Sequence, residues 1–135
     1  MNDVTAISEL LVRYATAVDT RDWELFRRCF TADALTDYGE VGKWNDSEEI
    51  AGFMEQVHVG FGPTNHMLSN ISVRVDGDEA TSTAYVHAVL TFADDPGWID
   101  CVGGYEDRLV RTPDGWRISN RVFRTTRMTS SADSR

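Results

Sequence analysis

Apolar residues in the first part of the chain recur at steps of three and four positions. The repeat begins after Thr5 and comprises Ile7, Leu10, Leu11, Tyr14, Ala15 and Val18. This spacing is that of an amphipathic helix with one buried face, and Thr5 is a suitable N-cap. The pattern therefore predicts a helix that runs out near Asp19 and turns Tyr14 toward the core.

Two further helices and a short strand are predicted before residue 60. A second helix begins after Asp22, a candidate N-cap, and its apolar residues extend to Phe30. The segment Leu35 to Tyr38 is typical of a short strand. A third helix begins at Ser47, where two glutamates precede an apolar stripe that runs from Ile50 to Val57.

After Gly60 the chain changes character, and long segments suited to strands are separated by short turns of aspartate, proline and glycine. The four predicted strands are His66 to Val75, Ala80 to Phe92, Trp98 to Arg111 and Trp116 to Met128. In the second of these strands, odd-numbered and even-numbered positions take opposite faces. Long strands with polar residues at intervals suit a curved sheet that wraps the helices and leaves a pocket between them.

This order of elements indicates an α+β fold with three N-terminal helices packed on a curved, mostly antiparallel sheet. With 135 residues and 41% hydrophobic content, the chain suits one domain, over residues 1–128. The polar tail from Thr129 to Arg135 is expected to be disordered.

Composition also limits the partners. A formal charge of -9 argues against nucleic acid and anionic membranes, which both need a cationic surface. No stretch is long and apolar enough to cross a bilayer, and the N-terminus lacks the regions of a signal peptide, so a cytoplasmic protein is expected. Small molecules and proteins remain as partners. Cys29 and Cys101 are expected to be small buried hydrophobes.

Asp19 and His66 carry the candidate chemistry. Asp19 falls in the last helical turn, where a carboxylate opposes the helix dipole and a purely structural helix would prefer a cation. His66 follows a Gly/Pro turn. A carboxylate that accepts a hydrogen bond from one imidazole nitrogen leaves the other nitrogen as a base. If the fold joins them, the pair is a proton-transfer device; otherwise they are a helix-end aspartate and a loop histidine.

Other kinds of site are disfavoured. The three histidines, at 58, 66 and 87, show no ligand spacing, and an aspartate-histidine pair falls short of a catalytic zinc site. The chain has no glycine-rich phosphate loop in a strand-turn-helix setting, and no serine or cysteine nucleophile stands out. We therefore expect no metal and no cofactor, and acid-base chemistry on a small, largely apolar molecule.

Three stretches resemble the SnoaL-like branch of the nuclear transport factor 2-like superfamily. They are Tyr14 to Asp19 followed by Asp22-Trp23, Thr64-Asn65-His66-Met67, and Asp114-Gly115-Trp116. The resemblance extends from about Thr5 to Met128 and implies an α+β barrel in which a curved sheet closes a cone of helices. The first stretch is similar to that of scytalone dehydratase, bile acid 7α-dehydratase and hexachlorocyclohexane dehydrochlorinase.

The resemblance implies roles for individual residues. It makes Asp19 the carboxylate that supports His66, the base, with Tyr14 and Tyr38 as tyrosines that act on the substrate. Substrate-binding candidates are His87, Asn70, Arg124 and Trp44, of which Trp44 stands in a polar loop suited to a lid. The tyrosines have an alternative interpretation as core residues, and Asn70 and Arg124 as ordinary sheet residues. Two departures are that Val18 replaces a second family tyrosine and that a second family histidine falls near Leu90 rather than at His87.

The leading functional hypothesis is a lyase of the dehydratase type that acts on a small hydrophobic, hydroxylated molecule such as a steroid or polyketide. The same dyad would also serve an isomerase or a polyketide cyclase. A non-catalytic binder or an accessory subunit of an oxygenase is the alternative from a different class, because function belongs to the site and not to the fold. A homo-oligomer formed through the outer face of the sheet is expected, as a dimer rather than a trimer.

Overall fold

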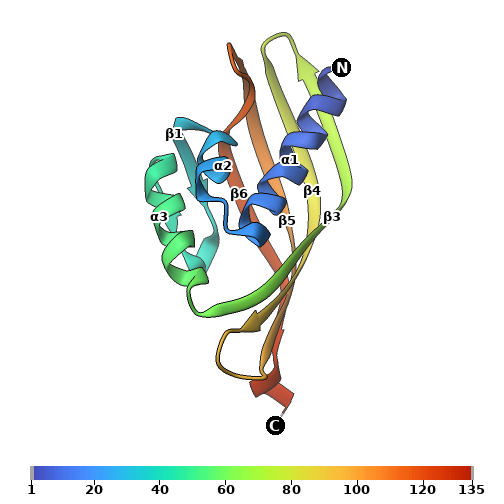
Figure 1. Ribbon diagram of the computed structural model, residues 1–135. Coiled ribbons are helices and arrows are strands. Elements are labelled where there is room, and N and C mark those ends of the chain that lie inside the picture. Colours follow the sequence, from blue (N-terminus) through green and yellow to red (C-terminus); the bar gives the residue numbers. More distant parts are fainter. Residues whose placement is uncertain (1, 135) are drawn as a thin grey trace.

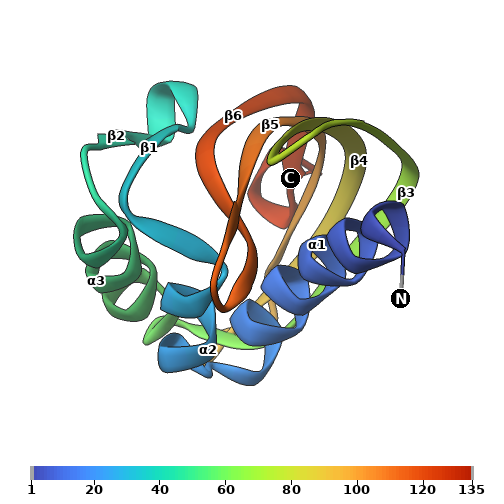
Figure 2. The same ribbon diagram turned by 90° about the horizontal axis from the view of Figure 1, so that it is seen from above.

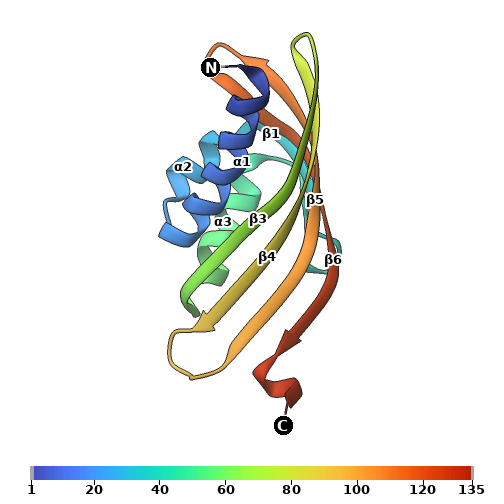
Figure 3. The ribbon, with the colours of Figure 1, turned by 90° about the vertical axis from the view of Figure 1, so that its right-hand side faces the viewer.

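A curved sheet of six strands carries all three helices on one of its faces (Figure 3). The computed structural model describes residues 2–134 (Figure 1). Its elements in chain order are α1 (Asp3–Thr20), α2 (Trp23–Arg28), β1 (Phe30–Asp37), the 3-10 turn η1 (Gly39–Val41), β2 (Lys43–Trp44), α3 (Ser47–His58), β3 (Phe61–Asp76), β4 (Glu79–Phe92), β5 (Trp98–Thr112), β6 (Gly115–Ser130) and the 3-10 turn η2 (Ser131–Ser134).

The strands follow the order β2-β1-β6-β5-β4-β3. Neighbouring strands are antiparallel except β1 and β6, which are parallel. β2 and β3 form the two edges of the sheet and do not pair with each other, so the sheet is open and the expectation of a barrel is wrong. In Figure 2, α3 lies beside β1 and β2, while α1 lies beside β3. The predicted α+β class, with three helices on a mostly antiparallel sheet, is confirmed.

One of the predicted N-caps is found in the structure, and the other two helices are capped by an earlier residue. Asp22 caps α2 as predicted, because its carboxylate accepts the Leu25 N–H at 3.0 Å. The cap of α1 is Asn2 rather than Thr5, and the cap of α3 is Asp46, one residue before Ser47. In both cases the side chain accepts the backbone N–H three residues ahead. None of the helices in residues 2–134 has both the length and the apolar character that a membrane span needs.

The four long strands lie where the sequence predicts them, with differences at their ends. β3 begins at Phe61, five residues before His66. Phe30 starts β1 and does not extend α2, which ends at Arg28. β6 continues through Ser130, two residues into the segment that was expected to be a disordered tail, and η2 follows it. Arg135 lies outside the described residues.

The concave face of the sheet and the helices enclose the core. Alternate β4 residues from Ala80 to Ala88 are buried on this face, and those between them, such as Tyr85 and His87, point outward. β6 breaks this alternation, because Leu109 pairs with Ile118 and Arg108 pairs with Asn120, which leaves Ser119 as an extra residue. Such a bulge reverses the faces that the following side chains take.

Cys29 and Cys101 are both buried free thiols. Burial raises the pKa of Cys29 to about 11 and raises the pKa of Cys101 above its ordinary value. Because the thiolate is the reactive form, both side chains serve as small apolar groups, as expected from the sequence.

Candidate active site

Asp19 and His66 are joined by two hydrogen bonds. Asp19 Oδ1 lies 2.7 Å from His66 Nδ1, and Asp19 Oδ2 accepts the His66 backbone N–H at 2.8 Å. The bonds form because the last turn of α1 lies against the first part of β3 (Figure 1). The side chains are 20% and 14% exposed, so water reaches the pair only in part. The contact expected from the sequence is present.

Thr64 and Arg21 hold the carboxylate of Asp19 in place. Thr64 Oγ1 donates to Asp19 Oδ1 at 2.9 Å and accepts from Arg21 Nη1 at 2.8 Å. The Arg21 guanidinium also donates to the carbonyls of Val18, at 2.9 Å, and Gly62, at 2.6 Å. Arg21 is the C-cap of α1, in the left-handed conformation with φ 61°. This cation and the donors around Asp19 offset the unfavourable position of a carboxylate at a helix C-terminus.

The environment of Asp19 fixes its protonation state. Burial raises the pKa of Asp19, but hydrogen bonds from the side chain and backbone of His66, the charge of His66 and the bond from Thr64 outweigh it, so the pKa lies below its ordinary value of 3.8. Asp19 is therefore an ionised carboxylate at neutral pH and can only accept. It follows that His66 Nδ1 carries a proton and that Nε2 of the neutral ring bears the lone pair.

His66 forms part of the wall of a cavity of about 140 Å³ between the helices and the sheet. Its lining residues are largely apolar: Tyr14, Val18, Tyr38, Val41, Met54, His58, Phe61, His66, Val86, Ala88, Leu90, Cys101, Tyr105, Phe123 and Met128. A small, mostly apolar ligand suits such a wall. In residues 2–134, no three His, Cys, Asp or Glu side chains are grouped as metal ligands would be.

Tyr14 of α1 and Tyr38, directly after β1, meet in this cavity. Their hydroxyl oxygens are 2.6 Å apart, and both side chains are buried. Burial raises the pKa of each tyrosine well above its ordinary value, so both are neutral phenols. Only one hydroxyl donates to the other, so the second keeps a hydrogen that this bond does not use, and Tyr105, which is also hydrogen-bonded to Tyr14, and a bound molecule are its available acceptors.

An ion pair that the sequence analysis missed lies behind the tyrosines. Arg121 of β6 bonds Asp107 of β5 through Nε and Nη2, at 2.8 and 2.9 Å, and each side chain is 1% exposed. The guanidinium lies 4.2 Å from the ring centroid of Tyr14 and 3.8 Å from that of Tyr105. Burial opposes the charge of Arg121, but Asp107 and the tyrosine oxygens keep the pKa of the guanidinium well above its ordinary value. A permanent positive charge therefore lies against the rings of Tyr14 and Tyr105, on the side away from solvent.

Comparison with known proteins identifies the family. Residues 1–122 match the family model described as a SnoaL-like domain. The chain belongs to this family. An uncharacterized protein of Mycobacterium tuberculosis is 41% identical over 124 residues, which make up 90% of this chain and 84% of that protein.

Solved structures share the fold of this SnoaL-like domain. A protein from Kribbella flavida has a TM-score of 0.87 at 28% identity, over 94% of this chain and 93% of its own. A candidate scytalone dehydratase from Novosphingobium aromaticivorans has a TM-score of 0.86 at 24% identity, over 93% of this chain and 85% of its own. A hexachlorocyclohexane dehydrochlorinase from Novosphingobium barchaimii has a TM-score of 0.82 at 19% identity, over 95% of this chain and 89% of its own. The family and fold inferred from the sequence are thus confirmed.

His58 of α3 lines the SnoaL-like cavity, although no role was predicted for it. Its Nδ1 lies 2.7 Å from the Met54 carbonyl, and its ring packs between those of Trp23 and Phe61, with centroids 5.4 and 5.3 Å away. The available signal was its spacing, because His58 follows the buried Met54 by four positions and so lies on the same helix face.

Two predicted substrate-binding residues lie on the opposite face of the sheet. His87 Nε2 bonds the Asp100 carboxylate at 3.0 and 3.1 Å, and its side chain is 46% exposed. Arg124 is 71% exposed and lies 3.6 Å from Glu106. The strict alternation of β4 places His87 outside, and the bulge at Ser119 turns Arg121 inward and Arg124 outward. Neither residue contacts the cavity.

The remaining two predicted binding residues are also displaced from the cavity wall. Asn70 is exposed at a bulge of β3, with φ 52°, a conformation that asparagine tolerates better than most residues. Trp44 is half-buried in β2 and packs against the rings of Tyr38 and Phe53, with centroids 5.7 and 4.8 Å away. Its contact with the site is thus indirect, through Tyr38.

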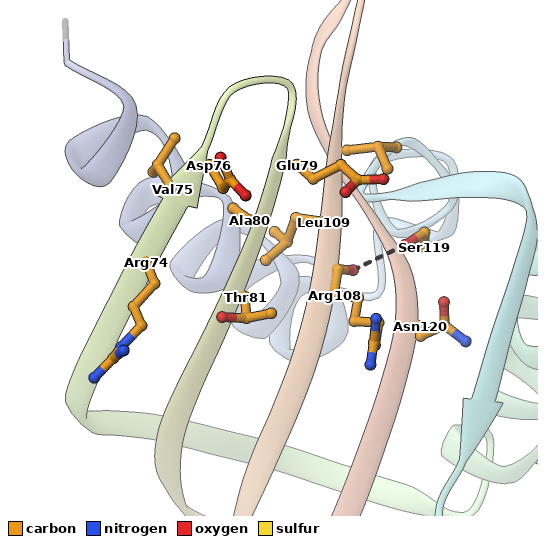
Figure 4. Close-up of a pocket in the computed structure, with 11 residues that line it drawn as sticks. Arg74, Val75, Asp76, Glu79, Ala80, Thr81, Arg108, Leu109, Ser119 and Asn120 are labelled. Atoms are coloured by element: carbon orange, nitrogen blue, oxygen red, sulfur yellow. Dashed lines mark hydrogen bonds between the residues drawn. The ribbon is translucent and has the colours of Figure 1, made fainter.

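A second hollow, of about 470 Å³, lies on the outer face of the sheet near the β3–β4 turn (Figure 4). Arg74 and Arg108 line it together with Asp76 and Glu79, and the Ser119 hydroxyl donates to the Arg108 carbonyl at 3.2 Å. Its lining residues include no imidazole, thiol or phenol. This hollow therefore offers no group suited to proton transfer at neutral pH.

Proposed function

We propose that this SnoaL-like protein is a cofactor-independent lyase of the dehydratase type that acts on a small hydrophobic, hydroxylated molecule. The observation that carries the proposal is the 2.7 Å bond between Asp19 and His66 at the wall of an apolar cavity. The fold shared with a candidate scytalone dehydratase and a dehydrochlorinase supports it.

The reaction begins with proton abstraction. His66 Nε2 takes a proton from a carbon next to an activating group, and the electron pair of the broken C–H bond becomes the new carbon-carbon π bond. The Asp19 carboxylate stabilises the imidazolium that forms. General base assistance of this kind accelerates reactions by about 10²- to 10⁴-fold.

The tyrosine pair assists the second half of the elimination. The C–O bond to the leaving hydroxyl breaks, and the free hydrogen of the Tyr14–Tyr38 pair lies at the cavity wall to stabilise the departing oxygen. The departing oxygen takes the proton that His66 accepted from carbon and leaves as water, so the imidazole returns to its neutral form. The positive charge of Arg121, stacked on Tyr14, favours negative charge that develops on the tyrosine hydroxyls.

Loss of water from a substrate panel tests the proposal. Hydroxylated aromatic polyketides, steroids and single-ring alcohols are incubated with the protein, and products lighter by one water are sought by mass spectrometry. His66→Ala is expected to lose most of the turnover while it keeps the circular dichroism spectrum of the wild type. The matched control is His87→Ala, because His87 lies on the outer face.

Other outcomes point to other functions. Rearranged products of unchanged mass, lost in His66→Ala, would identify an isomerase or a polyketide cyclase that uses the same dyad. Full turnover in His66→Ala would remove the dyad from the mechanism. No turnover, together with co-purification of a large oxygenase subunit, would identify an accessory role.

A further inference from the structure

We propose that His58 is a second substrate-contacting imidazole, whose Nε2 accepts a hydrogen bond from a hydroxyl group of a single-ring substrate. The proposal rests on the proposed function, because it concerns the molecule that occupies the same cavity. It assigns that molecule a class: a ring of about the size of benzene that carries a hydroxyl donor on the side facing α3.

The hydrogen bond of His58 determines which nitrogen is available. The Met54 carbonyl can only accept, so Nδ1 at 2.7 Å from it carries the ring hydrogen. Nε2 of the neutral ring then bears the lone pair. His58 lines the cavity, and within residues 2–134 no hydrogen bond joins its Nε2 to the protein. Nε2 is not fully enclosed by protein, so a ligand hydroxyl that donates to it takes the place of water, and the gain is that of one hydrogen bond.

His58 remains an acceptor while His66 changes its charge. Burial lowers the pKa of His58, and the nearby Arg21 and His66 lower it further, while the Met54 bond and Asp19 act in the opposite direction. A proton that arrives on His66 adds positive charge to the cavity and so disfavours a second one on His58. The rings of Trp23 and Phe61 hold the imidazole in one orientation.

The cavity beside the two histidines has room for a single ring, and it shares Tyr38, Val41, Phe123 and Met128 with a neighbouring hollow of about 980 Å³. About 140 Å³ is close to the ~150 Å³ of an apolar protein cavity that binds one benzene molecule. His66 and His58 both present an acceptor to this space, and the tyrosine pair presents a donor. A ring with one hydroxyl directed at His58 and an acidic C–H directed at His66 satisfies both acceptors.

Phenol and toluene test the proposal without turnover, since they have similar sizes and differ in one donor. We expect both to bind the wild type, and His58→Phe to weaken phenol relative to toluene by about three- to tenfold, the effect of one hydrogen bond. The affinity for toluene is expected to stay within twofold, which shows that the cavity is intact. His87→Phe, a histidine on the outer face, is the matched control and should leave the ratio unchanged.

Nitrogen-15 NMR of the wild-type imidazoles provides a second measurement that needs no variant. We expect a protonated Nδ1 on His58 and a shift of its Nε2 signal with phenol that anisole does not cause. An Nε2–H tautomer, a phenol to toluene ratio unaffected by His58→Phe, or no binding of either probe would overturn the proposal. Because no step requires catalysis, this result is independent of whether His66→Ala loses its activity.

Discussion

Thr64 connects Asp19 to the cation that follows α1. Its hydroxyl donates to Asp19 Oδ1 at 2.9 Å and accepts from Arg21 Nη1 at 2.8 Å, although the side chain is itself buried. The hydroxyl thus sets the orientation of the carboxylate that in turn holds His66, and it is a positioning residue that need not touch the substrate.

Replacing Thr64 with valine removes this hydroxyl at nearly constant shape. We expect kcat to fall by roughly ten- to a hundredfold, because small displacements of a catalytic group are costly, with a loss of about 1 to 3 kcal/mol in the free energy of unfolding. Thr64→Ser restores the hydroxyl and should recover most of kcat even if stability stays low. A serine variant as slow as the valine variant would mean that the hydroxyl does not position the dyad.

The depressed pKa of Asp19 predicts how stability depends on pH. The unfolded chain takes up a proton on this carboxylate near the ordinary value of 3.8, whereas the folded chain does so at a lower pH. The contribution of Asp19 is thus complete above that value and is lost as pH falls toward the folded pKa. Urea unfolding between about pH 6 and pH 3 should show a steeper loss of stability in the wild type than in Asp19→Asn. Parallel curves for the two proteins would contradict the shift.

The Arg121–Asp107 pair predicts a large and asymmetric response to mutation. Asp107→Asn leaves a buried guanidinium without its counter-charge and should cost about 3 to 5 kcal/mol in the free energy of unfolding. The double variant Asp107→Leu/Arg121→Met removes both charges and is expected to cost less than the two single changes together. Denaturant curves measure this coupling, and additive effects would show that the pair is not an energetic unit.

The outer face of the sheet predicts self-association. Tyr85 and Met67 are 60% and 48% exposed there, beside the His87–Asp100 pair. We expect a second copy of the chain to cover this face, as a dimer. Light scattering at micromolar concentration should give a mass near twice 15.2 kDa for the wild type and a smaller mass for Tyr85→Lys. A wild-type mass of one chain would exclude the dimer.

Local periodicity was enough to predict the helices and strands, and it also located the α1 residues of the candidate site. The apolar stripe of α1 identified the face that carries Tyr14, and the cost of a carboxylate at a helix end drew attention to Asp19. Its partner, 47 positions away, came from the family resemblance, since no local pattern encodes a contact at that distance.

The residues that were misplaced or missed depend on irregularities that no periodic pattern contains. A single extra residue at Ser119 exchanges the environments of Arg121 and Arg124, so alternation counted from Trp116 selects the wrong arginine. His58 was missed for a different reason, because the helical pattern places it on the same face as Met54 but does not show that other elements cover that end of the face.

The contact between Asp19 and His66 also bears on the order of folding, because it joins α1 to β3 across a large separation in sequence. The strands β3 and β4 are joined by a short turn and can pair early, whereas α1 reaches β3 only after a loop of more than forty residues has closed. We therefore expect His66 to acquire its carboxylate when the helix docks, after the β3–β4 hairpin has formed. Regain of the proposed turnover during refolding would report that docking step, and regain of β-type circular dichroism would report the earlier one.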